Sequence, residues 1–587
     1  MQAPVSDSLH WLSLENPVKI LQASVLEEVG PTLRRVEAAA AAGRIAAGFV
    51  SYEAAPAFDP ALKVQTPSSL PLAWFGVFEN AETLDQLPGG AASMAPDVAW
   101  HPSLSSAEYE QGIDAIHRHI ARGDTYQINF TLRLTSRLTG DPWDLFVDLC
   151  QGQRSRCCAF VDTGARVVCS ASPELFFRLE GERIWSRPMK GTAPRGRTLE
   201  EDHRQARWLR TSAKNQAENV MIVDMVRNDL GRVAIPETVR VAKLWHLEKY
   251  PSLFQLTSTV EARTRAPLDE IFTALFPCAS VTGAPKVRAM EIIRDLETGP
   301  RGVYTGAIGL IGPGRRARFN VGIRTVEIDT VAGQAQYGTG SGVVWDSDAH
   351  EEWRECRIKA LVLQPPPRDF ELLETMLWGP EIGFALLDRH LQRLESSAVY
   401  FDFSLDLAEV QQALNRAVRD LPRQAHRVRL LTNVDGSVRV ESTLLKHHAR
   451  PWRLALAADP VASDDRFLFH KTTHRQVYQQ HRERFPDHDD VLLWNERGEI
   501  TESTLANIVL VRQGRRITPP VSCGLLAGTL RAELLANGEI STGIVKLGDL
   551  DTAEELFLIN SVRQWIPVDL DTTTLAVAAE TRPRESA

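Results

Sequence analysis

GTGSGVVWDSDAHEEWRECRIKA, from Gly338 to Ala360, is the most informative stretch of the sequence. A glycine-rich loop opens it, and a helical segment follows in which Glu352, Glu355 and Lys359 share one face, because residues three and four apart are neighbours on a helix. Taken alone, this pattern is also typical of a solvent-exposed helix with ion pairs. The neighbouring segments decide between the two interpretations.

Two segments upstream carry a carboxylate and a lysine. SPELFF, Ser172 to Phe177, places Glu174 before an apolar run, and PMKGTAPRG, Pro188 to Gly196, places Lys190 in a loop rich in glycine and proline. Each segment alone is more typical of an exposed turn or of one more solvated lysine. Only their combination with other segments indicates chemistry.

The length of the chain predicts two domains. Single hydrophobic cores stop growing near ~250–300 residues, and this chain has 587. Three prolines at 365–367 end a helical stretch, because proline cannot continue a helix. We expect a first domain over residues 1–363, a proline-rich linker over 364–369, a second domain over 370–576 and a polar tail over 577–587.

Both domains are predicted to be α+β. In the first, β-branched and aromatic runs such as GVYTGAIGLIG alternate with helical stretches such as LDEIFTALF, which favours helices around a large sheet. In the second, RVRLLT and DDVLLW mix with the helical pattern LAEVQQALNRAV.

Composition excludes several classes of function. The net charge is −9 and there is no long basic run, so neither nucleic acid nor an anionic membrane is an expected partner. The beginning, MQAPVSDSLHWL, lacks the pattern of a signal peptide, and no apolar stretch is long enough to span a membrane. The seven cysteines are scattered without a C-x-x-C pair, so we expect neither disulfides nor zinc. A cytoplasmic enzyme acting on a small metabolite is the expectation.

Order and spacing of seven segments resemble the chorismate-utilising enzymes, which include anthranilate synthase component I, aminodeoxychorismate synthase component I, and the isochorismate and salicylate synthases. The resemblance covers most of residues 100–363 and implies the fold of that family. The segments are SPELFF, PMKGT, KNQAENVMIVDMVRNDLG, CASVTGAPKVRAMEII, GVYTGAIG, GIRTVE and the stretch quoted first.

This resemblance implies a site for Mg²⁺ and chorismate. Glu218, Glu352 and Glu355 would be the Mg²⁺ carboxylates, in keeping with a hard cation that takes oxygen ligands. The enolpyruvyl carboxylate of chorismate would be held by a guanidinium, a phenol and glycine-rich backbone, which all suit an anion. The residues implied are Arg324, Tyr304 and the Gly338-Thr339-Gly340 loop, with Ser280 and Lys359 lining the same pocket.

Lys190 distinguishes members of the family. Anthranilate synthases carry alanine at this position, whereas aminodeoxychorismate synthases carry a lysine that is thought to attack ring C2, so that the 4-hydroxyl leaves and ammonia enters at C4. Such a lysine must be neutral, so its pKa must fall from ~10.4. The resemblance makes Glu174 the general acid for the departing hydroxyl. Anthranilate synthesis is the lesser alternative.

The sequence departs from the family at two positions. Gln255 stands at or near the place of the usual histidine in Y-x-x-x-H-L-x-S, so a proton-transfer role of that histidine is not carried over. Asn215 replaces an acidic residue one turn before Glu218, from which we expect weaker Mg²⁺ binding. The sequence also lacks the Gly-x-Cys-x-Gly turn of a glutaminase, so ammonia is expected from a separate glutaminase subunit or from solution.

The second domain shows softer motifs. FELLETMLWGPEIGFALLDRHLQRLESSAVYF reads as a strand hairpin followed by a helix, and in isolation it is more typical of an amphipathic helix with a solvated Arg393. With FLFHKTTHRQVY, NERGEITESTLANIVLV, GLLAGTLR and NSVRQW, the order resembles the fold-type-IV pyridoxal-phosphate enzymes, namely branched-chain and D-amino-acid aminotransferases and aminodeoxychorismate lyase.

That resemblance implies a pyridoxal 5′-phosphate site and pairing of second domains in a homodimer. Lys471 would form the Schiff base, Arg393 would grip the phosphate, and Glu502 would face the pyridine nitrogen. Backbone N–H groups of Thr529 and Leu530, with the Ser561 hydroxyl, would complete the phosphate cup. Leu530 departs from the family, where a hydroxyl residue is common.

Three hypotheses stay open for the whole chain. The first is 4-aminobenzoate synthesis for the folate pathway, in which the lyase removes pyruvate from 4-amino-4-deoxychorismate. The second keeps the amination and makes the second domain an ordinary aminotransferase. The third makes the second domain a non-catalytic module.

Overall fold

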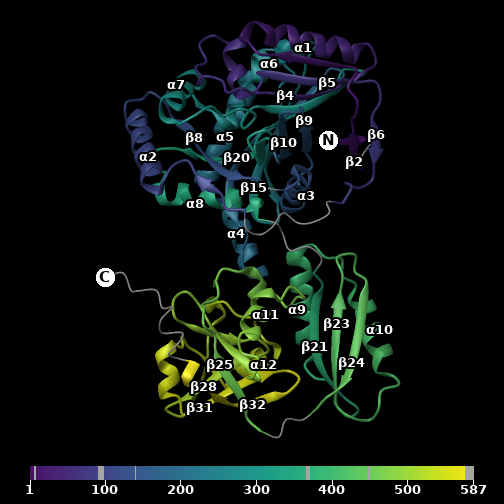
Figure 1. Cartoon of the computed structure of the whole chain (residues 1–587), viewed down its shortest axis with the longest axis vertical. Helices are drawn as coiled ribbons and strands as arrows, with labels where there is room; N and C mark the ends of the chain where they lie inside the picture. Colours follow the sequence, from purple (N-terminus) through teal and green to yellow (C-terminus); the bar gives the residue numbers. More distant parts are fainter. Residues whose placement is uncertain (6–7, 90–97, 139, 365–369, 447–449, 575–587) are drawn as a thin grey trace. The chain divides into compact units, whose positions relative to one another are not determined.

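The computed structural model describes residues 1–5, 8–89, 98–138, 140–364, 370–446 and 450–574. The chain forms two compact units, one from Met1–Arg195 with Gln205–Pro366 and one from Gly196–Arg204 with Pro367–Ala587 (Figure 1). The second unit thus includes a short segment, Gly196–Arg204, that lies within the first domain as drawn from the sequence. The expected linker, apart from Gln364, and the whole expected tail lie outside the described ranges. None of the helices in these ranges has the length and apolar character needed to cross a membrane.

Antiparallel sheets form the frame of the first unit. A ten-stranded sheet has the order β13 (Met189–Pro194), β15 (Leu253–Arg263), β12 (Arg183–Arg187), β11 (Leu175–Glu180), β18 (Arg316–Val321), β17 (Ala307–Gly312), β4 (Ile45–Val50), β5 (Ala73–Phe78) and β3 (Lys19–Ala23), with β14 (Arg240–Lys249) also paired to β15. A seven-stranded sheet has the order β16 (Gly283–Ala284), β8 (Gln127–Arg137), β20 (Gln334–Val343), β19 (Thr325–Asp329), β10 (Arg166–Ala171) and β9 (Cys158–Asp162), with β7 (His101–Pro102) paired to β8. A small third sheet contains β1 (Gln2–Val5), β2 (Ser8–Ser13) and β6 (Glu82–Leu84).

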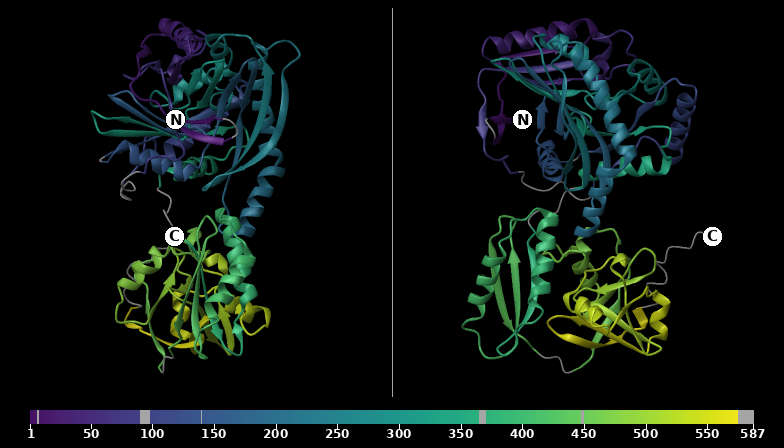
Figure 2. Two further views of the ribbon diagram at one scale, coloured as in Figure 1. Left: turned by 90° about the vertical axis from the view of Figure 1, so that its right-hand side faces the viewer. Right: turned by 180° about the vertical axis from the view of Figure 1, so that it is seen from behind.

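Helices cover these sheets and bury aromatic side chains against them. Phe272 of α6 packs edge-on against Phe319 of β18 with ring centroids 5.1 Å apart, and α1 packs against β3, β4 and β5 (Figure 2). Such close aromatic packing contributes beyond the area that it buries. The helices are α1 (Leu26–Ala41), α2 (Ser106–Ala121), α3 (Pro142–Gln153), α4 (Leu199–Thr211), α5 (Ala213–Gly231), α6 (Leu268–Leu275), α7 (Lys286–Leu296) and α8 (Ala349–Ala360).

The second unit combines an open sheet with a closed one. The open sheet has the order β22 (Gly383–Phe384), β21 (Leu372–Gly379), β23 (His426–Thr432) and β24 (Val438–Leu444), with α9 (Leu387–Phe401) and α10 (Leu407–Val418) packed on it. The other has the order β27 (Ile500–Ser503), β26 (Asp490–Trp494), β25 (Trp452–Leu456), β32 (Gln564–Leu570), β31 (Glu555–Asn560), β28 (Asn507–Arg512), β29 (Arg515–Thr518) and β30 (Ser541–Thr542). Because β27 pairs with both β26 and β28, six of these strands close into a ring. α11 (Gln476–Glu483) and α12 (Thr529–Ala536) complete the unit.

The expected α+β class is confirmed in both units. The hairpin and helix expected after Phe370 are β21, β22 and α9, and the pattern LAEVQQALNRAV coincides with α10. Periodicity could predict these elements because each has one buried face. For example, Val410 and Leu414 of α10 are buried four residues apart.

Candidate active sites

A cavity of about 220 Å³ in the first unit gathers most of the residues singled out there from the sequence. Gly338 does not line it, but lies so close to the Tyr304 ring that a Cβ at this position would overlap it. Sequence reasoning missed other residues of the wall, among them Asn129, Trp208 and Lys214. The predicted residues in the wall are Glu174, Lys190, Glu218, Ser280, Tyr304, Arg324, Thr339, Gly340, Glu352, Glu355 and Lys359.

Lys190 reaches the cavity from an irregular part of β13. The pairing of β13 with β15 shifts register between Met189 and Thr192, and Gly191 has a φ of +90°, which glycine adopts without strain. Burial lowers the pKa of the Lys190 amine, the Glu218 carboxylate opposes this shift, and Lys359 adds to it. Gly342 of β20 leaves room for the amine, since an added Cβ would stand 2.5 Å from Lys190 Nζ. The setting favours a neutral, nucleophilic amine.

Glu174 is buried between β10 and β11, with 2% of its surface exposed. Its Oε1 accepts hydrogen bonds from Ser280 Oγ at 2.6 Å and from Met189 N at 3.3 Å. Burial raises the pKa of the Glu174 carboxyl to about 7, although the bond from Ser280 acts against this shift. Near neutral pH this carboxyl can therefore both hold and release a proton.

The three predicted metal carboxylates come from α5 and α8. α8 begins at Asp348, whose side chain accepts a hydrogen bond from Glu351 N and so fixes the first turn. Glu352 accepts a hydrogen bond from Ser347 Oγ at 2.7 Å, and Glu355 pairs with Lys359 at 2.5 Å. The alternative of a solvent-exposed ion-pair helix does not describe α8, because these side chains line the cavity.

The three carboxylates offer oxygen ligands, which are the type of ligand that a hard cation prefers. Burial raises the pKa of Glu218 and of Glu352, and the neighbouring Glu355 carboxylate raises both further. A divalent cation would relieve this repulsion between carboxylates. In the described part of the chain, however, no three His, Cys, Asp or Glu side chains are arranged so that they could hold a metal ion. The residue types fit Mg²⁺, and the ligand geometry is not formed.

Arg324 presents unpaired donors next to the carboxylates. It is 4% exposed, and its Nε and Nη2 atoms have no hydrogen-bond partner. Buried guanidinium groups normally have partners, so open donors in a cavity wall favour an anionic ligand. Nearby, Lys359 Nζ donates to Gly340 O at 2.8 Å and Thr339 Oγ1 donates to Cys356 O at 3.0 Å, which ties β20 to α8.

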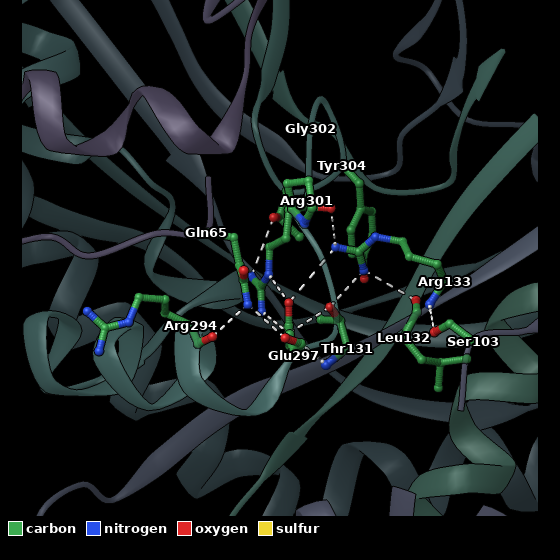
Figure 3. A network of polar contacts seen from close by, with 12 residues as sticks. Gln65, Ser103, Thr131, Leu132, Arg133, Arg294, Glu297, Arg301, Gly302 and Tyr304 are labelled. Carbon is green, nitrogen blue, oxygen red and sulfur yellow. Dashed lines mark hydrogen bonds and ion pairs between the residues drawn. The ribbon is translucent and has the colours of Figure 1, made fainter. Parts of the chain in front are cut away.

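A buried polar network lies behind Tyr304 (Figure 3). Arg301 and Glu297 form an ion pair of 2.6 Å with side chains 1% and 3% exposed. Glu297 also accepts hydrogen bonds from the N and Oγ1 of Thr131. The Arg133 guanidinium lies 4.9 Å from the centroid of the Tyr304 ring and donates to Pro300 O.

Two further buried carboxylates hold the backbone of the loop that carries Tyr304. Glu53 accepts hydrogen bonds from Arg301 N at 2.6 Å and Gly302 N at 2.9 Å. Glu327 accepts them from Val303 N at 2.6 Å and from Tyr304 N at 3.2 Å. Sequence reasoning missed both roles. The signal available for Glu53 was a single acidic residue in the apolar segment GFVSYEAAPA.

The two departures from the family pattern also lie in the cavity wall. Gln255 Nε2 donates to Thr192 Oγ1 at 3.4 Å, and its Oε1 has no partner. Asn215 is buried on the first turn of α5 beside Gly191. Neither amide side chain titrates, so at these two positions the cavity has no group that can gain or lose a proton. Both side chains are part of the wall, and the cavity remains open between them.

Lys471 is the amine that the sequence singles out in the second unit. It follows a 3₁₀ turn at Arg466–Leu468, and its carbonyl accepts a hydrogen bond from Leu373 N at 2.9 Å. Burial lowers the pKa of the Lys471 amine to about 7, with Arg475 and Arg393 contributing. An amine that is neutral near pH 7 can react with a carbonyl compound.

Glu502 on β27 is buried and surrounded by hydrogen-bond donors. It accepts hydrogen bonds from Tyr478 OH at 2.8 Å, Leu526 N at 3.1 Å and Asn507 Nδ2 at 3.2 Å. Burial raises the pKa of the Glu502 carboxyl to about 7, and the Tyr478 hydroxyl opposes this shift. Tyr478 was not singled out in the sequence. It lies three residues after Arg475, whose guanidinium carbon is 4.4 Å from the centroid of the Tyr478 ring.

The remaining predicted residues of the second unit lie in the middle of α9, at the start of α12 and directly after β31. Arg393 of α9 donates to Glu374 and, through Nη1, to Ala527 O at 3.3 Å. Thr529 and Leu530 open α12, where backbone N–H groups are free of helical partners and suit an anion. Ser561 Oγ donates to Thr375 O at 3.3 Å. With Lys471 and Glu502, these groups suit a phosphorylated carbonyl cofactor. Their roles stay predictions.

The first cavity thus combines a lysine, several carboxylates and an arginine with open donors. The family model for chorismate binding enzymes matches residues 6–365, which is more than half of the chain, and the chain therefore belongs to the chorismate-binding enzyme family. The model for amino-transferase class IV matches residues 371–570.

Curated relatives match about half of the chain. Aminodeoxychorismate synthase component 1 of Salmonella typhimurium is 39% identical over 259 residues, which are 44% of this chain and 57% of that protein. The protein of the same name from Bacillus subtilis is 37% identical over 296 residues, 50% of this chain and 62% of that protein. Anthranilate synthase component 1 of Streptomyces coelicolor is 40% identical over 265 residues, 44% of this chain and 51% of that protein. The chain thus spans less than two thirds of these relatives, and similarity alone does not choose between the two names.

Solved structures are similar to parts of the chain. Anthranilate synthase component I from Streptococcus pneumoniae has a TM-score of 0.54 at 24% identity and covers 62% of this chain and 93% of its own. This likeness supports the fold of the first unit. A putative amino-acid aminotransferase from Mesorhizobium loti is 40% identical, with a TM-score of 0.33, over 34% of this chain and all of its own.

Proposed function

We propose that the chain makes 4-aminobenzoate from chorismate in two steps. The first unit exchanges the 4-hydroxyl of chorismate for an amino group, and the second unit removes pyruvate from the resulting 4-amino-4-deoxychorismate. The two family matches and the relatives named aminodeoxychorismate synthase component 1 support this assignment. The product would supply folate synthesis.

The observation that carries the proposal is the buried Lys190 amine in one cavity with Glu174. Lys190 Nζ bonds to ring C2, both conjugated ring double bonds shift, and the C4–O bond breaks while Glu174 gives its proton to the leaving hydroxyl, which departs as water. Ammonia then bonds to C4 and returns a proton to Glu174, both double bonds shift back, and the bond between C2 and Lys190 Nζ breaks. Since anthranilate synthases carry alanine at this position, Lys190 favours amination at C4.

Substrate orientation follows from the charges in the wall. The open donors of Arg324 would bind the enolpyruvyl carboxylate, beside Tyr304 and the Thr339-Gly340 backbone. Glu218, Glu352 and Glu355 would hold Mg²⁺, and the bound cation would supply positive charge for a carboxylate of the substrate. Ammonia would come from solution or from a separate glutaminase subunit.

The second unit has the side chains for a lyase that uses pyridoxal 5′-phosphate. Lys471 would bond to the cofactor, Glu502 would face its ring nitrogen, and Arg393, Thr529, Leu530 and Ser561 would surround its phosphate. When bound, the cofactor supplies an electron sink for the amine substrate. Lys471 Nζ takes the proton from ring C4, and loss of pyruvate leaves an aromatic ring. We expect second units to pair in a homodimer.

The test is incubation of the full chain with chorismate, Mg²⁺, ammonium and pyridoxal 5′-phosphate, with products identified by chromatography. We expect 4-aminobenzoate and pyruvate, and only 4-amino-4-deoxychorismate from Lys471→Ala. The exposed Lys446 offers a matched control, Lys446→Ala. Formation of 2-aminobenzoate would refute the assignment of Lys190. Accumulation of the aminated intermediate in the unaltered chain, with turnover of a 2-oxo acid, would instead indicate an aminotransferase.

A further inference from the structure

Glu374 is the centre of a buried cluster, and the reaction above gives this carboxylate no part. It lies on β21 and is 1% exposed. Its Oε1 accepts a hydrogen bond from Arg393 Nε at 2.8 Å, and its Oε2 accepts one from Arg393 Nη2 at 2.6 Å. The same Oε2 stands 2.6 Å from His390 Nδ1. One carboxylate thus binds an arginine in a two-pronged manner and a histidine as well.

The cluster follows from the pattern of a strand and a helix. His390 and Arg393 are three residues apart on α9 and share a face, which packs on β21. Along β21, side chains alternate, so Glu374 points to the same face as the fully buried Leu372 and Met376. A carboxylate in this apolar layer requires partners, because a buried unpaired charge is costly.

The charges in the cluster are matched. Burial opposes ionisation of Glu374, but the Arg393 guanidinium and the His390 ring outweigh burial and lower the pKa of the carboxyl to about 2. Glu374 is therefore ionised at neutral pH, and its two-pronged bond fixes the plane of the guanidinium. Arg393 Nη1 also donates to Ala527 O. Only the remaining N–H groups of Nη1 and Nη2 are left for a ligand.

The cluster also reaches the start of α12. His390 Nε2 lies 3.3 Å from Thr529 Oγ1, so one imidazole ring joins Glu374 to the first residue of that helix. Arg393 and Thr529 are both expected near an anion, and both are connected to the Glu374 carboxylate, Arg393 directly and Thr529 through His390. Glu374 is itself negatively charged, so it cannot contact the anion favourably.

We propose that Glu374, acting through Arg393 and His390, is a positioning residue for the phosphate group of the cofactor. It holds the guanidinium directly and, through His390, the first residue of α12, whose backbone N–H is expected at the same anion. This inference rests on the proposal that the second unit binds pyridoxal 5′-phosphate. It assigns a specific part of the ligand, the phosphate, to the cluster.

The experiment compares two ligands that differ only in the phosphate. Binding of pyridoxal 5′-phosphate and of pyridoxal to the full-length apo-protein is titrated by absorbance, for the unaltered chain and for Glu374→Gln. We expect affinity for pyridoxal 5′-phosphate to fall about tenfold or more, because charge-assisted hydrogen bonds are misdirected, and affinity for pyridoxal to stay unchanged. Glu374→Asp, which keeps the charge, should recover part of the loss.

A matched control is Glu441→Gln. It removes a carboxylate from an arginine pair on the same sheet, with Arg429 at 3.0 Å, and should leave both affinities unchanged. His390→Gln provides a second variant should Glu374→Gln fail to fold, which the thermal unfolding of each apo-protein reports. It should weaken binding of the phosphorylated ligand alone, by a smaller factor.

Equal weakening of both ligands would overturn the inference, because it would mean a structural role only. Unchanged affinities in Glu374→Gln and His390→Gln would overturn it as well. If the unaltered chain bound neither ligand, the proposed function of the second unit would fail, and the inference with it. That outcome is distinct, since it is seen before any variant is made.

Discussion

At the level of single residues, the first cavity holds an acid and a base whose pKa values are shifted toward each other. Burial raises the pKa of Glu174 to about 7 and lowers that of Lys190. Both shifts favour the uncharged forms, a protonated carboxyl and a neutral amine, which one step of the proposed amination requires. The same apolar surroundings produce both shifts, because burial disfavours whichever form is charged.

This pair predicts a pH dependence of amination. Glu174 acts in its protonated form, so the rate at a constant concentration of free ammonia should fall as pH rises through about 7. Glu174→Gln should lower kcat about a hundredfold or more and abolish this decline. The measurement is the pH profile of kcat for both proteins.

Glu180→Gln is the control, since Glu180 lies on the adjoining β11 and pairs with Arg178 at the surface. It should keep both the rate and the decline. A profile of Glu174→Gln that still declined near pH 7 would assign that titration to another group.

At the level of elements, β20 sets the space around Lys190. Gly342→Ala would place a Cβ 2.5 Å from Lys190 Nζ, and the amine would have to move. Because displacement by about 1 Å can cost about a hundredfold in rate, we expect a loss of that order in kcat for amination. Thermal unfolding should change little.

Gly312→Ala is the matched control on a strand of the same unit. Its Cβ would meet nothing closer than Ile45 at 4.0 Å, so the rate should be retained. A Gly342→Ala protein as active as this control would show that Lys190 does not need its present position.

The loop after α7 depends on a buried ion pair. Glu297→Gln leaves Arg301 buried with no carboxylate partner on that side, and removing one partner of a buried pair costs about 3–5 kcal/mol. We expect a clearly lower thermal unfolding midpoint of the first unit and a higher KM for chorismate, because this loop carries Tyr304.

The exposed pair of Arg294 with Asp295 provides the comparison, and Asp295→Asn should cost less than about 1 kcal/mol. Equal midpoints of the two variants would mean that the network of Figure 3 does not stabilise the loop.

At the level of the whole molecule, the proposed reactions use separate units and separate cofactors. Chelation of Mg²⁺ should stop amination of chorismate, since the carboxylates of the first cavity would lose the ion that orients the substrate. Conversion of added 4-amino-4-deoxychorismate should continue at the same rate. Both rates are measured as 4-aminobenzoate formed, before and after Mg²⁺ is restored. Loss of both activities on chelation would contradict separate cofactor requirements.

The sequence by itself determined the α+β class, the elements with one apolar face, and a set of candidate side chains that the cavity of the first unit largely gathers. These could be predicted because periodicity and residue type are local properties. Only the tertiary structure decided which other groups hold the candidate side chains and their loops in position. Glu53 binds Arg301 N across 248 positions, Glu374 binds Arg393 across 19, and Tyr478 meets Glu502 across 24. Such partners leave no local pattern, because a buried carboxylate finds its donors only when distant segments pack together.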